Sequence, residues 1–124
     1  MSKIVVTGPV IVKEGKILLV LDDDKILKLP GGKAELNESL EDACRREAKE
    51  EINGDVSLLG KLSTFTMEIS GRVHELHHFL AKLKNEDVKP LAEVKKILWV
   101  DIDKLGQYYI VPNIKYLLER GEIK

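Results

Sequence analysis

The chain has 124 residues, enough for a single domain spanning 1–124, and 44% of them are hydrophobic while 33% are charged. This composition excludes a disordered chain. The net charge of −1 argues against a protein that coats DNA or RNA, so we expect no nucleic-acid partner. The single cysteine, Cys44, is typical of a reducing compartment, and no apolar run approaches the ~20 residues of a membrane span. We therefore expect a cytoplasmic protein without a membrane partner.

The first third of the chain is predicted to form strands and turns. Residues 4–12 and 17–21 are apolar and rich in β-branched side chains, and a polar segment with one glycine separates them, which predicts a β-hairpin. Three aspartates at 22–24 predict a solvated turn. A short strand is expected over 26–29, and regular structure should stop at the Pro-Gly-Gly of 30–32.

Residues 39–52 are predicted to form the central helix, because they contain neither Gly nor Pro and are mostly strong helix formers. Ser39 is a favourable N-cap. Asn53 and Gly54 both tolerate the left-handed backbone that ends a helix. Local signals thus define both ends of this element.

The second half of the chain adds strands and a terminal helix. The predicted elements are strands over 56–67, 73–83 and 97–100, a hairpin turn at 70–71, a helical turn over 101–105 and a helix over 113–120. Strands combined with one central and one terminal helix indicate an α/β (α+β) arrangement of mixed layers.

The central helix carries three carboxylates that should share its inward face. On a wheel of about 100° per residue, Glu47 and Glu51 fall within about 20° of Leu40, and Glu50 lies about 80° away. Charges at inward positions need partners, and like charges at this spacing repel unless a cation lies between them. A hard divalent cation such as Mg²⁺ provides that charge through oxygen ligands. We interpret the face as a metal site, with a salt-bridged structural face as the alternative.

The loop before the helix strengthens this interpretation. Gly31 and Gly32 allow the backbone to approach a ligand closely, and Lys33 follows at once. Glu35 and Glu38 lie on the same loop. A Gly-rich turn that runs into a helix N-terminus is a natural phosphate site. A Gly-Gly pair alone is more often a plain turn, but a short spacer joins this pair to the acidic helix, which favours the phosphate site.

With these residues in view, the sequence resembles the Nudix hydrolases, whose signature is G-x5-E-x7-R-E-U-x-E-E-x-G-U, with U a bulky apolar residue. Gly32 takes the first position, Glu38 follows after five residues, and Arg46-Glu47 follows after seven more. Glu50 and Glu51 supply the acidic pair. The resemblance implies a Nudix-type α/β/α sandwich with a mixed central sheet.

The resemblance also implies roles for individual residues. Glu47, Glu50 and Glu51 match the metal-binding glutamates, and the Gly31 carbonyl often completes such a site. Arg46 matches the arginine that orients a glutamate of the signature. Glu38 matches an acidic residue that supports the loop or binds a further metal through water. The substrate-binding set that we predict is Gly32, Lys33 and Glu38. The implied cofactor is Mg²⁺, with Mn²⁺ as a second candidate.

The general base remains open between positions inside and outside the signature. The candidates are Glu50 or Glu47 within it and Glu93 or Glu75 beyond it. The catalytic set that we predict is therefore Glu50, Glu47, Arg46 and Glu93.

The chain departs from the signature at its end. Asn53 stands where the family has Gly, and Gly54 stands where it has an apolar residue. Asn is the next-best residue for a left-handed helix end, and Val56 is the apolar residue that could replace the lost contact. Ala48 is small for its U position, and Asn37 stands where many members have Gly. None of these changes removes a predicted ligand or catalytic group.

Two further patterns are weaker. In residues 74–78, His-Glu-Leu-His-His, strand alternation divides the cluster between two faces, so a half-exposed strand is favoured over a metal site. The second pattern is a set of aromatic residues of the kind favoured at protein interfaces, namely Trp99, Tyr108 and Tyr109. Because Nudix proteins are also often homodimers, we expect a homodimer.

Two functional classes follow from the resemblance. The first is Mg²⁺-dependent hydrolysis of a pyrophosphate linkage in a nucleoside diphosphate linked to another moiety, such as a nucleoside triphosphate or ADP-ribose. The second is a catalytically silent Nudix-fold module that binds or senses a nucleotide. The intact Arg46, Glu47, Glu50 and Glu51 favour the enzyme, because a binder need not keep all four.

Overall fold

A computed structural model describes residues 3–23 and 25–124, so Asp24 of the predicted aspartate turn lies outside the described residues. The elements, in chain order, are β1 (Ile4–Lys13), β2 (Lys16–Leu21), β3 (Leu27–Lys28), β4 (Gly32–Lys33), α1 (Leu40–Ile52), β5 (Val56–Lys61), β6 (Phe65–Ile69), β7 (Arg72–Leu83), β8 (Lys96–Asp101), a 3₁₀ helix η1 (Ile102–Gln107) and α2 (Pro112–Glu119). No helix of the described residues is long and apolar enough to cross a membrane.

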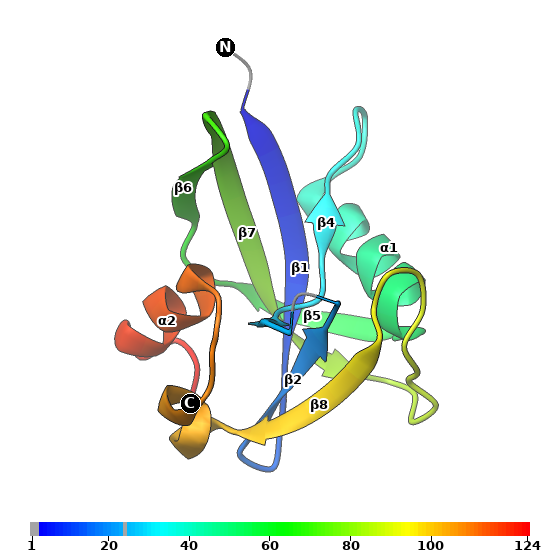
Figure 1. Cartoon of the computed structure of the whole chain (residues 1–124). Helices are drawn as coiled ribbons and strands as arrows, with labels where there is room; N and C mark the ends of the chain where they lie inside the picture. The colour runs from blue at the N-terminus through cyan, green and yellow to red at the C-terminus, as the bar shows by residue number, and fades with distance from the viewer. Residues whose placement is uncertain (1–2, 24) are drawn as a thin grey trace.

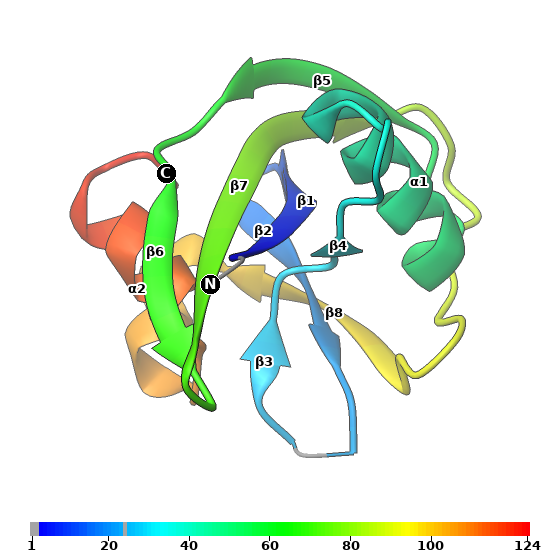
Figure 2. The same cartoon turned by 90° about the horizontal axis from the view of Figure 1, so that it is seen from above.

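The strands form one mixed sheet with the order β3-β2-β1-β7-β5 (Figures 1 and 2). β4 also pairs with β1, β6 with β7 and β8 with β2. The long strands β1 and β7 run parallel over eight residue pairs, and the other pairings between these strands are antiparallel. The predicted mixed central sheet is therefore confirmed.

Both faces of the sheet are buried, which explains the continuous apolar runs in the sequence. In β2, Ile17 and Leu19 pack into a cluster that includes residues of α2 and η1, whereas Leu18 and Val20 pack into a second cluster with residues of α1. Helix α1 covers one face and α2 lies on the other (Figure 2). This three-layer arrangement is the predicted α/β/α sandwich.

The predicted ends of the central helix are confirmed. The Ser39 side chain accepts a hydrogen bond from the Asp42 N–H at 3.0 Å and caps the N-terminus. Asn53 takes the left-handed conformation with φ 56° at the C-terminus. Val56 is buried, as expected of a residue that compensates for the missing apolar contact at Gly54.

Two predicted boundaries are wrong. The segment 56–67 is not one strand, because β5 ends at Lys61 and β6 begins at Phe65. Both pair with β7, and the register shifts near Leu59 and again between the two strands. The Pro-Gly-Gly segment does not end regular structure either, because Gly32 pairs with Thr7 of β1 and opens the short strand β4.

Candidate active site

The loop that contains Gly31 is fastened to the end of α1 by one hydrogen bond. The Gly31 N–H donates to Oε1 of Glu51 at 2.9 Å, although the two residues are 20 positions apart. Strand β4 holds the following residues beside β1 through the pairs Thr7–Gly32 and Val6–Lys33. The sheet and the helix together therefore fix this loop against the acidic face of α1.

Both glycines are required by close contacts. A Cβ atom on Gly32 would lie 2.5 Å from Oε1 of Glu47. A Cβ on Gly31 would lie 2.5 Å from the carbonyl oxygen of Thr7, and the Gly31 φ of 150° is itself unfavourable for other residues. The Gly-Gly pair thus lets the backbone lie directly against a carboxylate of the helix.

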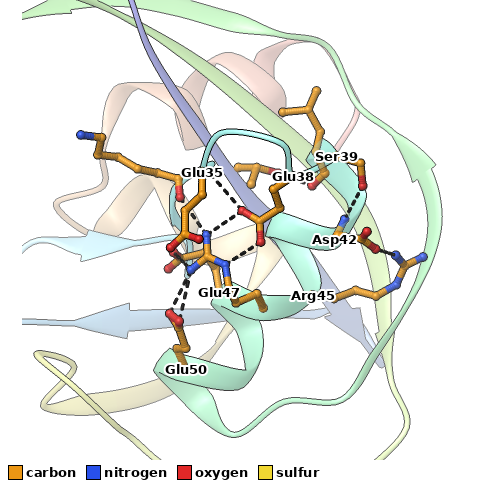
Figure 3. Close-up of polar contacts among 11 residues, drawn as sticks. Glu35, Glu38, Ser39, Asp42, Arg45, Glu47 and Glu50 are labelled. Carbon is orange, nitrogen blue, oxygen red and sulfur yellow. Dashed lines mark hydrogen bonds and ion pairs between the residues drawn. The ribbon is translucent and has the colours of Figure 1, made fainter.

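Arg46 forms hydrogen bonds with Glu38, Glu47 and Glu50, and Figure 3 shows the carboxylates of these three glutamates converging on one place beside the helix. Its Nε and Nη2 donate to the two oxygens of Glu38 at 2.7 and 3.0 Å, and Nη1 donates to Oε2 of Glu47 at 2.9 Å. Nη1 also contacts both oxygens of Glu50 at 3.0 and 3.1 Å, and Nη2 donates to the Lys33 carbonyl at 2.9 Å. Such a bidentate guanidinium–carboxylate contact fixes both partners in direction as well as distance.

Glu38 connects this arginine to the loop. Its Oε1 accepts a hydrogen bond from the Glu35 N–H at 3.0 Å in addition to the contacts from Arg46. The Arg46 guanidinium, followed by the Glu35 N–H, lowers the pKa of the Glu38 carboxyl below its usual value, so Glu38 stays ionised. Asn37 takes the left-handed conformation with φ 68°, as expected at a position where many Nudix sequences have Gly.

Glu47 and Glu51 are the buried carboxylates of α1, with exposed fractions of 9% and 8%. Burial raises the pKa of Glu51 to about 7, and the nearby charges of Glu47 and Glu93 act in the same direction, while the Gly31 N–H opposes them. Burial also raises the pKa of Glu47, against the opposing effect of Arg46. Because the pKa of both carboxyls is raised, the surrounding protein groups compensate the negative charges of Glu47 and Glu51 only in part.

Glu50 does not share the inward face, so the wheel prediction is wrong for this residue. Its side chain is 51% exposed and its carboxylate is turned toward Arg46, one helical turn earlier. The 80° offset places Glu50 at the edge of the face, where an arginine at i,i+4 spacing attracts it. The structure therefore brings Glu47 and Glu51 together and places Glu50 beside them.

A pocket of about 720 Å³ lies over this constellation. The predicted site residues that line it are Gly31, Gly32, Lys33, Arg46, Glu47, Glu51 and Glu93. Sequence reasoning missed Leu36, which also lines the pocket and is 94% exposed. The signal that could have identified it is an apolar residue in an otherwise polar loop.

Glu75 lies elsewhere and does not line this pocket. Its carboxylate contacts Lys3 Nζ and His77 Nε2, each at 2.7 Å, and these contacts lower the pKa of Glu75. The predicted division of the histidine cluster is confirmed, because His77 shares a face with Glu75 while His78 is buried and accepts a hydrogen bond from the Asn113 amide at 2.9 Å. Of the two outer base candidates, the pocket includes Glu93 alone.

The donor chemistry of the pocket fits a hard divalent cation. Glu47 and Glu51 present carboxylate oxygens whose charges are under-compensated, and among the described residues Glu51 forms no ion pair with Lys or Arg. Within residues 3–23 and 25–124, no three His, Cys, Asp or Glu side chains are grouped so that they could hold a metal as they stand. Glu50, which could be the third ligand, is held by Arg46 in this arrangement.

Comparison with known proteins agrees with this geometry. A family model described as the NUDIX domain matches residues 1–120. The CTP pyrophosphohydrolase of Escherichia coli (strain K12) is 28% identical over 124 residues, covering 96% of this chain and 91% of that protein. The solution structure of the E. coli ORF135 protein is similar with a TM-score of 0.82 at 27% identity, over 96% of this chain and 88% of that one. The MutT protein from Methanosarcina mazei Go1 gives a TM-score of 0.86 at 25% identity, over 97% and 94% of the two chains.

The family match spans nearly the whole chain, including the loop, the helix and the pocket described above. The resemblance stated from the signature and the fold class derived from it are both confirmed. The chain therefore belongs to the NUDIX family of pyrophosphohydrolases, which act on phosphoric anhydride bonds.

Proposed function

We propose that this protein hydrolyses the pyrophosphate linkage of a nucleoside diphosphate linked to another moiety, with divalent cations bound at the pocket over α1. The observation that supports this most directly is the pair of buried, under-compensated carboxylates of Glu47 and Glu51 beside the Gly31-Gly32 backbone. The divalent cations that accompany a phosphate chain would supply the positive charge that these groups lack.

The metal ligands in this proposal are Glu47, Glu50 and Glu51 together with the Gly31 carbonyl. Mg²⁺ or Mn²⁺ at this donor set would offset the charge of the phosphates and lower the pKa of an attacking water. For Glu50 to take part, its carboxylate must leave Arg46, a rearrangement that an exposed side chain can make without repacking the core. Arg46 keeps its bidentate contact with Glu38 and continues to orient Glu47.

The remaining residues bind the substrate and move the proton. Lys33 is exposed at the rim of the pocket and can contact a phosphate group. The Gly32 backbone lies against the Glu47 carboxylate, so a phosphate beside this backbone would share a cation with Glu47. Glu38 acts through Arg46 to hold the loop in place. Among the base candidates, we favour Glu93, because it lines the pocket and has no ion pair with any described residue.

The substrate that we favour is a nucleoside triphosphate, because the E. coli relative is described as a CTP pyrophosphohydrolase and covers nearly the whole chain. ADP-ribose and related nucleotides share the same linkage and remain in the test set. In each case water attacks one phosphorus of the linkage, the bridging P–O bond breaks, and the proton from water is taken by the base.

A substrate screen tests the proposal. Purified protein is incubated with CTP, ATP, ADP-ribose and a dinucleoside polyphosphate, with Mg²⁺ or with a chelator, and the products are separated by chromatography. Glu50→Gln should lower turnover by at least about 100-fold, because it removes a charge from the metal and base region. Glu41→Gln is the matched control, since Glu41 is exposed on the same helix and lines no part of the pocket.

Two results would contradict the proposal. The first is a folded Glu50→Gln variant that turns over substrate at the wild-type rate, which would show that Glu50 is not part of the site. Nucleotide binding without hydrolysis of any substrate by the wild type would favour the silent binding module instead.

A further inference from the structure

A second pocket lies at the other end of the sheet. Its volume is about 910 Å³, and it shares no lining residue with the pocket over α1. The catalytic loop pairs with β1 at Val6 and Thr7, whereas the second pocket takes Ile11, Val12 and Lys13 of the same strand. At the usual rise of a strand, Val12 is about 17 Å beyond Thr7. The β1–β2 hairpin marks this end of the molecule (Figure 1).

The pocket has an apolar wall with an aromatic residue. Trp99 of β8 lines it, together with Leu83 of β7 and Leu59 of β5. Leu59 sits where the β5–β7 register shifts between Leu58 and Gly60, and its side chain is 62% exposed. A β-bulge changes the direction of one side chain relative to the regular alternation of the strand. The bulge therefore places the apolar side chain of Leu59 at the pocket, whereas a regular strand would direct it elsewhere.

The rim of the same pocket is basic although the whole chain is slightly acidic. Five lysines and two glutamates line it, in a protein of net charge −1. Lys16 and Lys84 have acidic partners, Asp101 at 2.8 Å and Asp55 at 3.6 Å. Lys13 and Lys82 are exposed and form no ion pair with any residue that the structure describes. The pocket therefore combines an apolar wall that includes Trp99 with the unpaired ammonium groups of Lys13 and Lys82.

We propose that this second pocket binds a small organic anion with a flat or apolar body, of the size and chemistry of a nucleoside monophosphate. The apolar wall formed by Trp99, Leu59 and Leu83 would contact the body, and Lys13 and Lys82 would contact the anionic group. The volume lies within the range of pockets for small ligands, which are typically apolar with a few placed polar groups. This site is separate from the hydrolysis proposed above and does not depend on it.

Charge favours this occupant over a second copy of the chain. A symmetric contact through this face would bring the unpaired Lys13 and Lys82 of both copies to one interface, which is unfavourable without intervening anions. An acidic peptide would satisfy the lysines, but a cavity of this volume with an aromatic wall suits a compact ring better than an extended chain.

Trp99 provides the readout, because it is the only tryptophan in the chain. AMP is titrated into the protein with a chelator present, so that hydrolysis plays no part, and tryptophan fluorescence is followed. Adenosine and inorganic phosphate are titrated separately as the body without the charge and the charge without the body. We expect a saturable change with AMP, and a much weaker response with either fragment.

The matched variants are Lys13→Gln/Lys82→Gln in the pocket and Lys89→Gln/Lys115→Gln outside both pockets. The pocket variant should bind AMP at least about tenfold more weakly, while the control binds like wild type. Metal-dependent turnover should be the same in both variants, which separates this site from the catalytic pocket.

Four results would overturn the proposal. The first is no change in Trp99 fluorescence at millimolar AMP, and the second is equal AMP affinity in the wild type and the pocket variant. The third is a dimeric mass by light scattering that Leu59→Asp abolishes and AMP does not change, which would assign the face to a second copy. Displacement of AMP by a glutamate-rich peptide at lower concentration would assign it to an acidic protein partner.

Discussion

Glu51→Gln in the metal-free protein should raise stability above neutral pH. Glu51 is 8% exposed, and burial raises its pKa to about 7 from the ordinary value of 4.5. The folded chain therefore holds a proton that the unfolded chain releases between these two pH values, and stability falls as pH rises through about 7. The difference corresponds to about 3 kcal/mol of destabilisation once Glu51 is ionised in both states.

The glutamine side chain keeps the shape and can still accept the Gly31 N–H, but it does not ionise. Without metal, the variant should melt close to wild type near pH 5 and up to about 10 °C higher near pH 8.5. Circular dichroism melts in a chelator at both pH values measure the difference. Adding Mg²⁺ should stabilise wild type more than the variant, because the ionised carboxylate then has a partner.

Glu41→Gln is the control, since Glu41 is exposed in the first turn of the same helix. Its melting temperature should differ little from wild type at either pH. If the melting temperature of Glu51→Gln follows that of wild type at both pH values, Glu51 is not a buried, under-compensated carboxylate, and the argument for its role as a metal ligand loses its physical basis.

Three further predictions address other parts of the molecule. Arg46→Lys loses the bidentate contact with Glu38, so turnover should fall by about 10- to 100-fold. The melting temperature should change little, and steady-state kinetics and thermal melts measure the two effects. Gly32→Ala places a Cβ 2.5 Å from Glu47 Oε1, so the flexible carboxylate must move; isothermal titration should show weaker Mg²⁺ binding in a folded protein, and unchanged affinity would contradict this. Burial lowers the pKa of His78 to about 4 from 6.5, so stability should fall by up to about 3 kcal/mol as pH decreases from 6.5 to 4, and denaturant titrations of His78→Gln should lack this dependence.

The features that were predictable from the sequence are those set by local rules. The ends of α1 follow from Ser39 and Asn53, because capping depends on the residues at the helix ends and not on distant contacts. The fixed spacing of the signature residues from Gly32 to Glu51 identifies the family, because these residues lie on one loop and one helix. The family in turn implies the α/β/α sandwich.

What the sequence could not provide depends on competition between groups and on strand register. A helical wheel gives the direction of Glu50 but not the attraction of Arg46 one turn away, which turns that carboxylate outward. The choice between Glu75 and Glu93 depends on where β7 and a distant loop lie relative to α1, and β1–β7 pairing places Glu75 opposite Val5. The break between β5 and β6 arises from extra residues in the pairing with β7, for which the chain has no strong local signal.

The central claim is that the carboxylates of α1 support metal-dependent cleavage of a nucleoside diphosphate linkage. The most direct measurement is the turnover of CTP and the other test nucleotides by wild type, Glu50→Gln and Glu41→Gln, each shown to be folded, with Mg²⁺ and with a chelator. We predict Mg²⁺-dependent hydrolysis by wild type and Glu41→Gln and a loss of at least about 100-fold in Glu50→Gln. Hydrolysis that persists in the chelator, or that Glu50→Gln retains in full, would contradict the claim.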